Sequence, residues 1–180
     1  MKGIVFTEFL EMVEKKFGYA TVDAIIEESN LPSEGSYTSV GTYDYGEMVL
    51  LISNLSDKMN LPIPELLRSF GGYIFDTFLK SYPSFFERSE NSFEFLESID
   101  NHVHIEVKKL YPDAELPRFE TNRVSDDTLE MIYSSTRKMG EFAIGLIEKT
   151  MAHYGEPMVM NSQILESDGS KIKFTITKVS

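Results

Sequence analysis

Residues 93–119 read FEFLESIDNHVHIEVKKLYPDAELPRF, and the interpretation of the chain starts from this stretch. It is typical of a helix that ends at a proline-bearing turn, because Pro112 cannot continue a helix. Asn91 or Ser92 can cap the first turn. We therefore expect one helix that runs to about Leu110.

Two of the three histidines, His102 and His104, lie in this predicted helix. Residues two positions apart point about 200° apart on an α-helix, so the two side chains cannot serve one metal ion. From position alone, His104 is either a hydrogen-bonded residue at the edge of the core or a metal ligand. His153 falls in the last turn of a later predicted helix, where a surface or capping role is expected.

Length and composition predict a single domain: the chain has 180 residues, of which 42% are hydrophobic and 26% are charged. The net charge of −12 argues against nucleic acid, whose phosphates are bound by Lys and Arg. It also argues against anionic membrane surfaces and favours a partner protein with a basic face. The 13 phenylalanines and 9 tyrosines indicate a large core or the lining of a site for a flat apolar ligand.

The chain has no cysteine, which excludes disulfides, iron–sulfur clusters, thiolate haem ligation and cysteine zinc sites. No stretch approaches the roughly 20 apolar residues that span a bilayer. A signal peptide is not expected, because Glu8 and Glu11 interrupt the first apolar residues. Together, these features favour a cytoplasmic protein. Nucleophile-elbow and phosphate-binding glycine motifs are missing as well, so we expect a protein that is not an enzyme.

The periodicity of apolar residues predicts helices first and strands later. This order is typical of an α+β fold, here with a four-stranded antiparallel sheet. Besides the helix described above, helices are predicted over 2–17, 21–28, 44–59, about 62–78 and 138–154, and strands over 117–125, 128–137, 158–166 and 171–179.

Gly71 and Gly72 lie in the middle of a predicted helix, where each glycine costs about 1 kcal/mol relative to alanine. Such a pair indicates that another backbone or a ligand approaches closely, or that the helix kinks.

Tyr133, Ser135 and Arg137 follow one another at a spacing of two residues in the predicted strand 128–137. On a strand they share one face, where a phenol, a hydroxyl and a guanidinium can donate hydrogen bonds to carboxylates. A solvated sheet face explains the same pattern when it stands alone. When the pattern is taken together with the histidine that precedes Tyr111-Pro112, a binding site is favoured over a solvated sheet face.

These features occur together with other short motifs in one order along the chain: Met1 to Phe6, Phe70-Gly71, Tyr82-Pro83, Phe85-Phe86, His104, Leu110-Tyr111-Pro112, Pro117, Phe119 and then Tyr133, Ser135 and Arg137. In this order and spacing, nearly the whole chain resembles the H-NOX family, the haem-nitric oxide/oxygen binding domains that include the haem domain of soluble guanylate cyclase. The resemblance implies a helical lobe of about residues 1–60 packed on a haem-holding lobe of about residues 61–180, with the haem between them.

His104 rather than His102 matches the iron ligand of this family, because it lies seven residues before Tyr111. The resemblance therefore implies that His104 binds the ferrous iron of haem b. Some bacterial members also bind zinc through cysteines, and no such site is expected in a chain without cysteine.

The resemblance also assigns the groups around the haem. It implies that Tyr133, Ser135 and Arg137 hold the two propionates and that Pro117 presses on the macrocycle. The distal side and the haem plane would be lined by apolar residues, namely Val5, Phe9, Ile74, Phe142 and Leu146.

Phe142 stands where oxygen-binding members of the family have a tyrosine, five residues beyond the arginine of the propionate motif. A hydrogen-bond donor holds bound dioxygen, whereas nitric oxide binds ferrous haem without one. Phe9 and Ile74 supply no donor either, and Tyr73 should point elsewhere because it lies beside Ile74. The resemblance thus implies a nitric oxide sensor that excludes dioxygen and binds carbon monoxide more weakly.

We expect such a sensor to signal in trans, since no kinase, cyclase or receptor segment follows the last strand. The family suggests a histidine kinase or a cyclic-di-GMP enzyme of a bacterium as the partner. The signal would be the release of His104 and a shift of the lobes, with give at Gly71-Gly72 and in the loop 111–117. Two alternatives stay open: a haem-free protein-interaction domain and a carrier of an apolar ligand.

Overall fold

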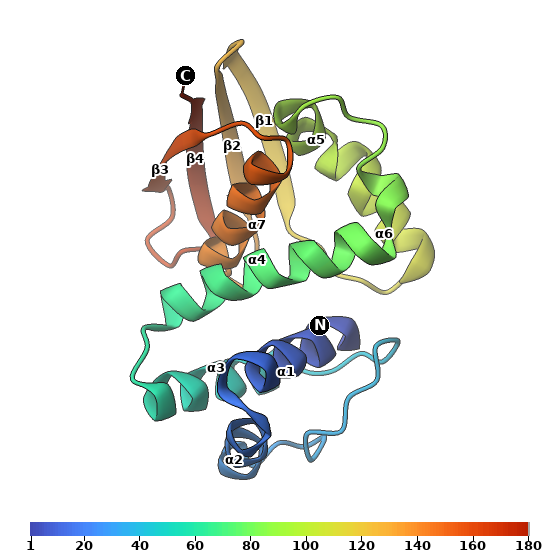
Figure 1. The fold of residues 1–180 in the computed structure, drawn as a ribbon, viewed down its shortest axis with the longest axis vertical. Coiled ribbons are helices and arrows are strands. Elements are labelled where there is room, and N and C mark those ends of the chain that lie inside the picture. The colour runs from blue at the N-terminus through green and yellow to red at the C-terminus, as the bar shows by residue number, and fades with distance from the viewer. Residues whose placement is uncertain (180) are drawn as a thin grey trace.

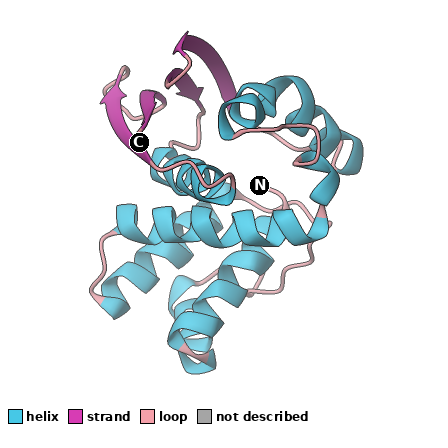
Figure 2. Cartoon of the chain, turned by 45° about the horizontal axis from the view of Figure 1, so that its top comes forward, coloured by secondary structure: helices cyan, strands magenta, loops and turns pink. Residues whose placement is uncertain are grey.

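The structure, a computed structural model, describes residues 1–179. The first three helices lie on one side of a long fourth helix, and the sheet lies on the other side together with the later helices (Figures 1 and 2). The prediction of an α+β fold is confirmed. The elements are α1 (Gly3–Phe17), α2 (Tyr19–Ser29), α3 (Tyr45–Met59), α4 (Ile63–Ser81), a 3-10 turn (Pro83–Phe85), α5 (Ser92–Ser98), a π-helical turn η2 (Ile99–Val103), α6 (His104–Leu110), β1 (Arg118–Ser125), β2 (Thr128–Ser134), α7 (Gly140–His153), β3 (Met158–Ile164) and β4 (Lys171–Lys178).

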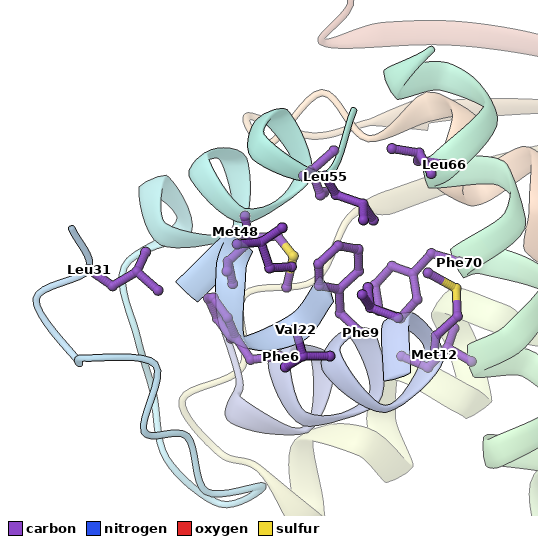
Figure 3. Close-up of a cluster of buried hydrophobic side chains, with 14 residues drawn as sticks. Phe6, Phe9, Met12, Val22, Leu31, Met48, Leu55, Leu66 and Phe70 are labelled. Atoms are coloured by element: carbon purple, nitrogen blue, oxygen red, sulfur yellow. The ribbon is translucent and has the colours of Figure 1, made fainter. Parts of the chain in front are cut away.

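Helices α1, α2 and α3 pack together beneath α4, which crosses the middle of the molecule (Figure 1). Their apolar faces meet α4 in one buried cluster that includes Phe9 and Phe70 (Figure 3). Helix α3 begins as predicted, because the Asp44 carboxylate accepts a hydrogen bond of 2.6 Å from the backbone N–H of Gly46. Helix α4 contributes to this cluster although it begins after residue 60. The predicted division into two lobes near residue 60 therefore stays a prediction.

Helix α7 covers one face of the sheet, whose strand order is β1-β2-β4-β3 with every neighbouring pair antiparallel. The side chains between helix and sheet form a second cluster of buried residues. No helix within residues 1–179 is long and apolar enough to cross a membrane.

Helices α4 and α7 touch through their backbones. A Cβ atom added to Gly71 would lie 2.2 Å from the carbonyl oxygen of Phe142, and one added to Gly145 would lie 2.0 Å from that of Arg68. From the sequence alone, the paired glycines have three explanations. For Gly71, the close approach of another backbone is confirmed.

The helix predicted over residues 92–110 is interrupted in its middle. Asn91 caps α5 through its side chain, which accepts from the backbone N–H of Glu94 at 3.0 Å. The backbone N–H of His104 then donates to the carbonyl of Ile99, five residues back, which is the bond of a π-helix. The prediction of one regular helix is wrong here, because a π-turn leaves both flanks helical and does not disturb their apolar pattern.

Strand β2 ends at Ser134, three residues before the predicted end. Ser135 still donates its backbone N–H to Ser170 at 2.9 Å. The chain then turns into α7 through Lys138, whose φ is 55°. The prediction that Tyr133, Ser135 and Arg137 share one face of a strand is therefore wrong, because only Tyr133 lies in the strand.

Candidate functional site

His104 is the first residue of α6. Among the histidines of residues 1–179, it is the one that pairs with a carboxylate. Its side chain is 17% exposed, and Nδ1 lies 2.9 Å from Oδ1 of Asp100. Burial lowers the pKa of His104, although Asp100 acts in the opposite direction. The shift favours the neutral imidazole, the form in which histidine binds metals.

Asp100 was missed in the sequence, although it lies four residues before His104, the spacing at which helical side chains meet. Its second oxygen, Oδ2, accepts the backbone N–H of Phe119 at 3.0 Å. The carboxylate is thus held between η2 and β1 while it faces Nδ1. Metal-binding histidines commonly direct their second ring nitrogen to a carboxylate in this way, which leaves Nε2 for the metal.

The other two histidines have different surroundings. Nδ1 of His102 lies 3.5 Å from Nη1 of Arg88. The His153 ring packs on Phe75 and Phe86, each with its centroid 5.9 Å away. Residues 1–179 contain no group of three or more His, Cys, Asp or Glu side chains suited to a metal ion.

Tyr133, Ser135 and Arg137 come together at the end of β2 even though they do not share a strand face. Tyr133 is 2% exposed, and its hydroxyl accepts the backbone N–H of Met139 at 2.9 Å. Burial raises the pKa of Tyr133, and the Ser135 and Arg137 side chains oppose the shift. Ser135 Oγ accepts the backbone N–H of Arg137 at 3.2 Å, so a tight turn gathers the three groups.

Phe119 joins this corner to His104. Its ring centroid lies 6.1 Å from that of His104 and 5.7 Å from that of Tyr133. Pro117 is half-buried and directly precedes β1, so it lies in the loop between α6 and the strand that carries Phe119.

The five predicted apolar residues come from three helices and meet in one cluster. Val5 and Phe9 lie on α1, Ile74 on α4, and Phe142 and Leu146 on α7. Phe70 is not among the predicted distal residues, but it connects two of them. Its ring centroid lies 5.2 Å from that of Phe9 and 5.1 Å from that of Phe142 (Figure 3 shows Phe9 and Phe70).

This cluster reaches the helix of His104 through Leu146. That side chain packs against a second aromatic cluster, and Val103 and Val107, on either side of His104 in the chain, pack against the same cluster. Tyr73 turns away, as predicted, because its hydroxyl accepts a hydrogen bond of 2.9 Å from Lys15. The cluster thus offers hydrocarbon and aromatic surface without a nearby tyrosine hydroxyl from α4.

The chemistry of these groups fits a haem. A neutral imidazole backed by a carboxylate suits the iron, apolar side chains suit the macrocycle, and a phenol, a hydroxyl and a guanidinium suit the two carboxylates at its edge. A haem-free interaction domain has no need of this combination.

Comparison with known proteins points the same way. A family model described as HNOB, Haem-NO-binding, matches residues 2–162. The unliganded Fe(II) H-NOX protein from K. algicida is 44% identical, with 100% of this chain and 97% of that chain covered and a TM-score of 0.96.

Two further solved structures extend the similarity. The H-NOX from Shewanella woodyi, solved in solution in the Fe(II)CO state with IWP-051 bound, is 37% identical, with 99% and 95% of the two chains covered and a TM-score of 0.85. The H-NOX protein from S. oneidensis in the Fe(II)NO state is 21% identical, with 100% of both chains covered and a TM-score of 0.89, and shows the same fold. A search of the curated proteins found no match.

Proposed function

Because the chain belongs to the Haem-NO-binding, or H-NOX, family of haem-based gas sensors, which are not enzymes, we propose that it senses nitric oxide and excludes dioxygen. The observation that carries this choice of gas is Phe142, which packs on Phe70 in an apolar cluster. A bound dioxygen needs a hydrogen-bond donor there, and nitric oxide does not. Carbon monoxide is the weaker ligand.

His104 is the proposed iron ligand, through Nε2. Haem b, when bound, supplies a ferrous iron with an open position for a diatomic gas. Asp100 holds the imidazole of His104 in place from the Nδ1 side, where the two atoms lie 2.9 Å apart. The carboxylate thereby also makes the ring a better electron donor.

Tyr133, Ser135 and Arg137 are the proposed partners of the propionates. Their hydroxyl and guanidinium groups lie at the turn between β2 and α7, and the side chain of Arg137 is 17% exposed. Pro117 is proposed to press on the macrocycle, and Val5, Phe9, Ile74, Phe142 and Leu146 to line the opposite side.

The proposed signal is the release of His104 when nitric oxide binds on the side of Phe142. Two structural features support this part of the proposal. The α5 helix is anchored by buried Phe93 and Leu96, whereas no residue of α6 is buried. The π-turn η2 separates the two helices, and π-turns inside helices occur frequently at functional sites. His104 is the first residue beyond it.

A shift of the helical lobe against the remainder would then pass the signal to a partner in trans. We propose a histidine kinase or a cyclic-di-GMP enzyme, in the cytoplasm of a bacterium. The net charge of −12 suits a partner with a basic docking surface.

Replacement of His104 by alanine tests the site. The purified variant should lose the Soret band of the wild type and regain it with added imidazole, which can occupy the space that the side chain leaves. His102→Ala is the matched control, two residues away, and should keep the band. A variant His104→Ala with an unchanged ferrous spectrum would overturn the assignment, and a wild-type protein without haem would favour the interaction domain or the carrier.

A further inference from the structure

The guanidinium of Arg137 already has an anionic partner within the chain. Nη2 donates to Oε2 of Glu115 at 2.9 Å, and Nη1 donates to the backbone carbonyl of the same residue at 2.6 Å. Glu115 lies in the loop between α6 and β1, two residues before Pro117. One residue of this loop thus engages both ends of the fork.

The two contacts differ in what they can do. The carbonyl is neutral and belongs to a loop whose neighbouring residue, Ala114, is buried, so it can hold the guanidinium in place permanently. The carboxylate belongs to a side chain that is 84% exposed, whereas the side chain of Arg137 is only 17% exposed. Rotation of Glu115 into water costs little and leaves a well-positioned, uncompensated cation behind.

The surroundings favour exchange of one carboxylate for another. A cleft of about 440 Å³ opens here and is lined by Glu115, Leu116, Arg118, Ser134, Ser135, Thr136, Arg137, Glu166, Ser170 and Lys171. Arg118 and Lys171 keep it attractive to anions, and hydroxyl groups offer further hydrogen bonds. Within this cleft, Glu115 is the carboxylate that pairs with Arg137.

We propose that Glu115 is an internal stand-in for a haem propionate: its carboxylate neutralises Arg137 in the haem-free protein and gives up this position when haem enters. This inference rests on the proposed function, because it assumes that Arg137 holds a propionate. Its consequence is that Glu115 keeps the site ordered without haem and weakens haem binding, since the pair must be broken and a second negative charge stays near the propionates.

Replacement of Glu115 by glutamine provides the test. The variant keeps the shape and the backbone carbonyl contact but removes the charge. We expect the equilibrium dissociation constant of haem, measured by titration of the haem-free protein, to fall by about two- to fivefold, the range that a pair with one exposed partner supports. Haem transfer to apomyoglobin should slow correspondingly, and the difference from wild type should shrink in high salt.

Glu166→Gln is the matched control, because Glu166 lines the same cleft and pairs with no group of Arg137. Because this substitution removes a charge from the cleft but breaks no pair with Arg137, its gain in haem affinity should be smaller than that of Glu115→Gln. Equal affinities of wild type and Glu115→Gln, equal gains in both variants, or weaker binding by Glu115→Gln would each overturn the proposal while leaving the haem site intact. A wild-type protein that takes up no haem would overturn the proposed function and this inference with it.

Discussion

The proposed choice of gas depends on one side chain, Phe142. It lies on α7 with its ring centroid 5.1 Å from that of Phe70. Phe142→Tyr adds one hydroxyl in this apolar cluster, where it can donate to bound dioxygen. A net hydrogen bond contributes about 0.5–1.5 kcal/mol, so the dioxygen affinity should rise by about two- to tenfold. Absorption spectra of the ferrous protein under increasing oxygen pressure measure it.

Phe85→Tyr serves as the control for this experiment, because Phe85 lies in the 3-10 turn, belongs to a different aromatic cluster and stacks on Tyr82 at a centroid distance of 5.2 Å. The control should behave as the wild type. An unchanged dioxygen affinity in Phe142→Tyr would remove the explanation of the selectivity without touching the role of His104.

Asp100 is the second residue whose proposed role can be tested by substitution, because its carboxylate lies 2.9 Å from Nδ1 of His104. Asp100→Asn keeps a group that can accept the backbone N–H of Phe119, which now lies 3.0 Å from Oδ2, but it removes the charge opposite Nδ1. The imidazole then donates less electron density to the iron. Resonance Raman spectra should show a lower iron–histidine stretching frequency, and an unchanged frequency would contradict the role assigned to Asp100.

The candidate site was predictable from sequence only where residue type and spacing carry information. His104, Tyr133 and Arg137 have such a pattern. Asp100 and Phe70 are not among the predicted site residues. Asp100 lies four residues before His104, but an acidic residue at this spacing is common in an acidic chain, and Phe70 is one of 13 phenylalanines, so residue type and spacing do not single out either of them. Their roles depend on contacts across the fold, with Phe119 and Phe142.

Two helices determine the shape of the apolar side of the site. At the crossing of α4 and α7, a Cβ at Gly71 would lie 2.2 Å from a backbone oxygen, whereas one at Gly72 would meet only the flexible Lys149 side chain at 3.4 Å. The two glycines are neighbours and differ only in what they face, so they form a matched pair.

Gly71→Ala should lower the free energy of unfolding by about 1–3 kcal/mol, because the helices must separate. Gly72→Ala should raise it by about 0.5–1 kcal/mol, because alanine favours the helix and finds room. Denaturant unfolding of the haem-free proteins measures both. Equal effects of the two substitutions would show that the crossing is looser than described.

At the scale of elements, the apolar periodicity located the four strands and the helical segments, although it joined α5 and α6 into one helix, and it did not determine two details of the site. Strand β2 stops at Ser134 because the turn through Lys138 leads into α7. The π-turn before His104 adds a residue without changing the apolar pattern on either side. The end of β2 and the π-turn are both defined by backbone hydrogen bonds, from Ser135 to Ser170 and from His104 to Ile99. Residue types do not specify these bonds.

Across the whole molecule, Lys2 connects the start of α1 and the loop before α3 with the loop that follows α6. Its ammonium donates to Asp113 at 3.0 Å, to Thr42 at 2.8 Å and to the carbonyl of Val40 at 2.9 Å. It also lies 5.5 Å from the centre of the Tyr111 ring. Through these contacts, Lys2 connects the end of α6 with α1 and with the loop before α3.

Lys2→Met should loosen both loops together, since it removes every one of these contacts. Amide hydrogen exchange should become faster in residues 38–43 and 111–115 and stay unchanged in β2 and β4. Lys15→Met, which removes a surface pair with Glu11 on the same helix, is the control and should leave both loops unaffected. Faster exchange in only one loop would show that Lys2 does not couple them.

The absorption spectrum of the ferrous protein tests the central claim most directly. It is recorded without oxygen, in air, and after addition of nitric oxide to the anaerobic sample. A nitric oxide sensor with His104 on the iron and Phe142 on the other side should show a Soret band that is the same with and without air and shifts with nitric oxide. A Soret band that shifts reversibly in air, or a protein that stays colourless when produced with added haem, would contradict it.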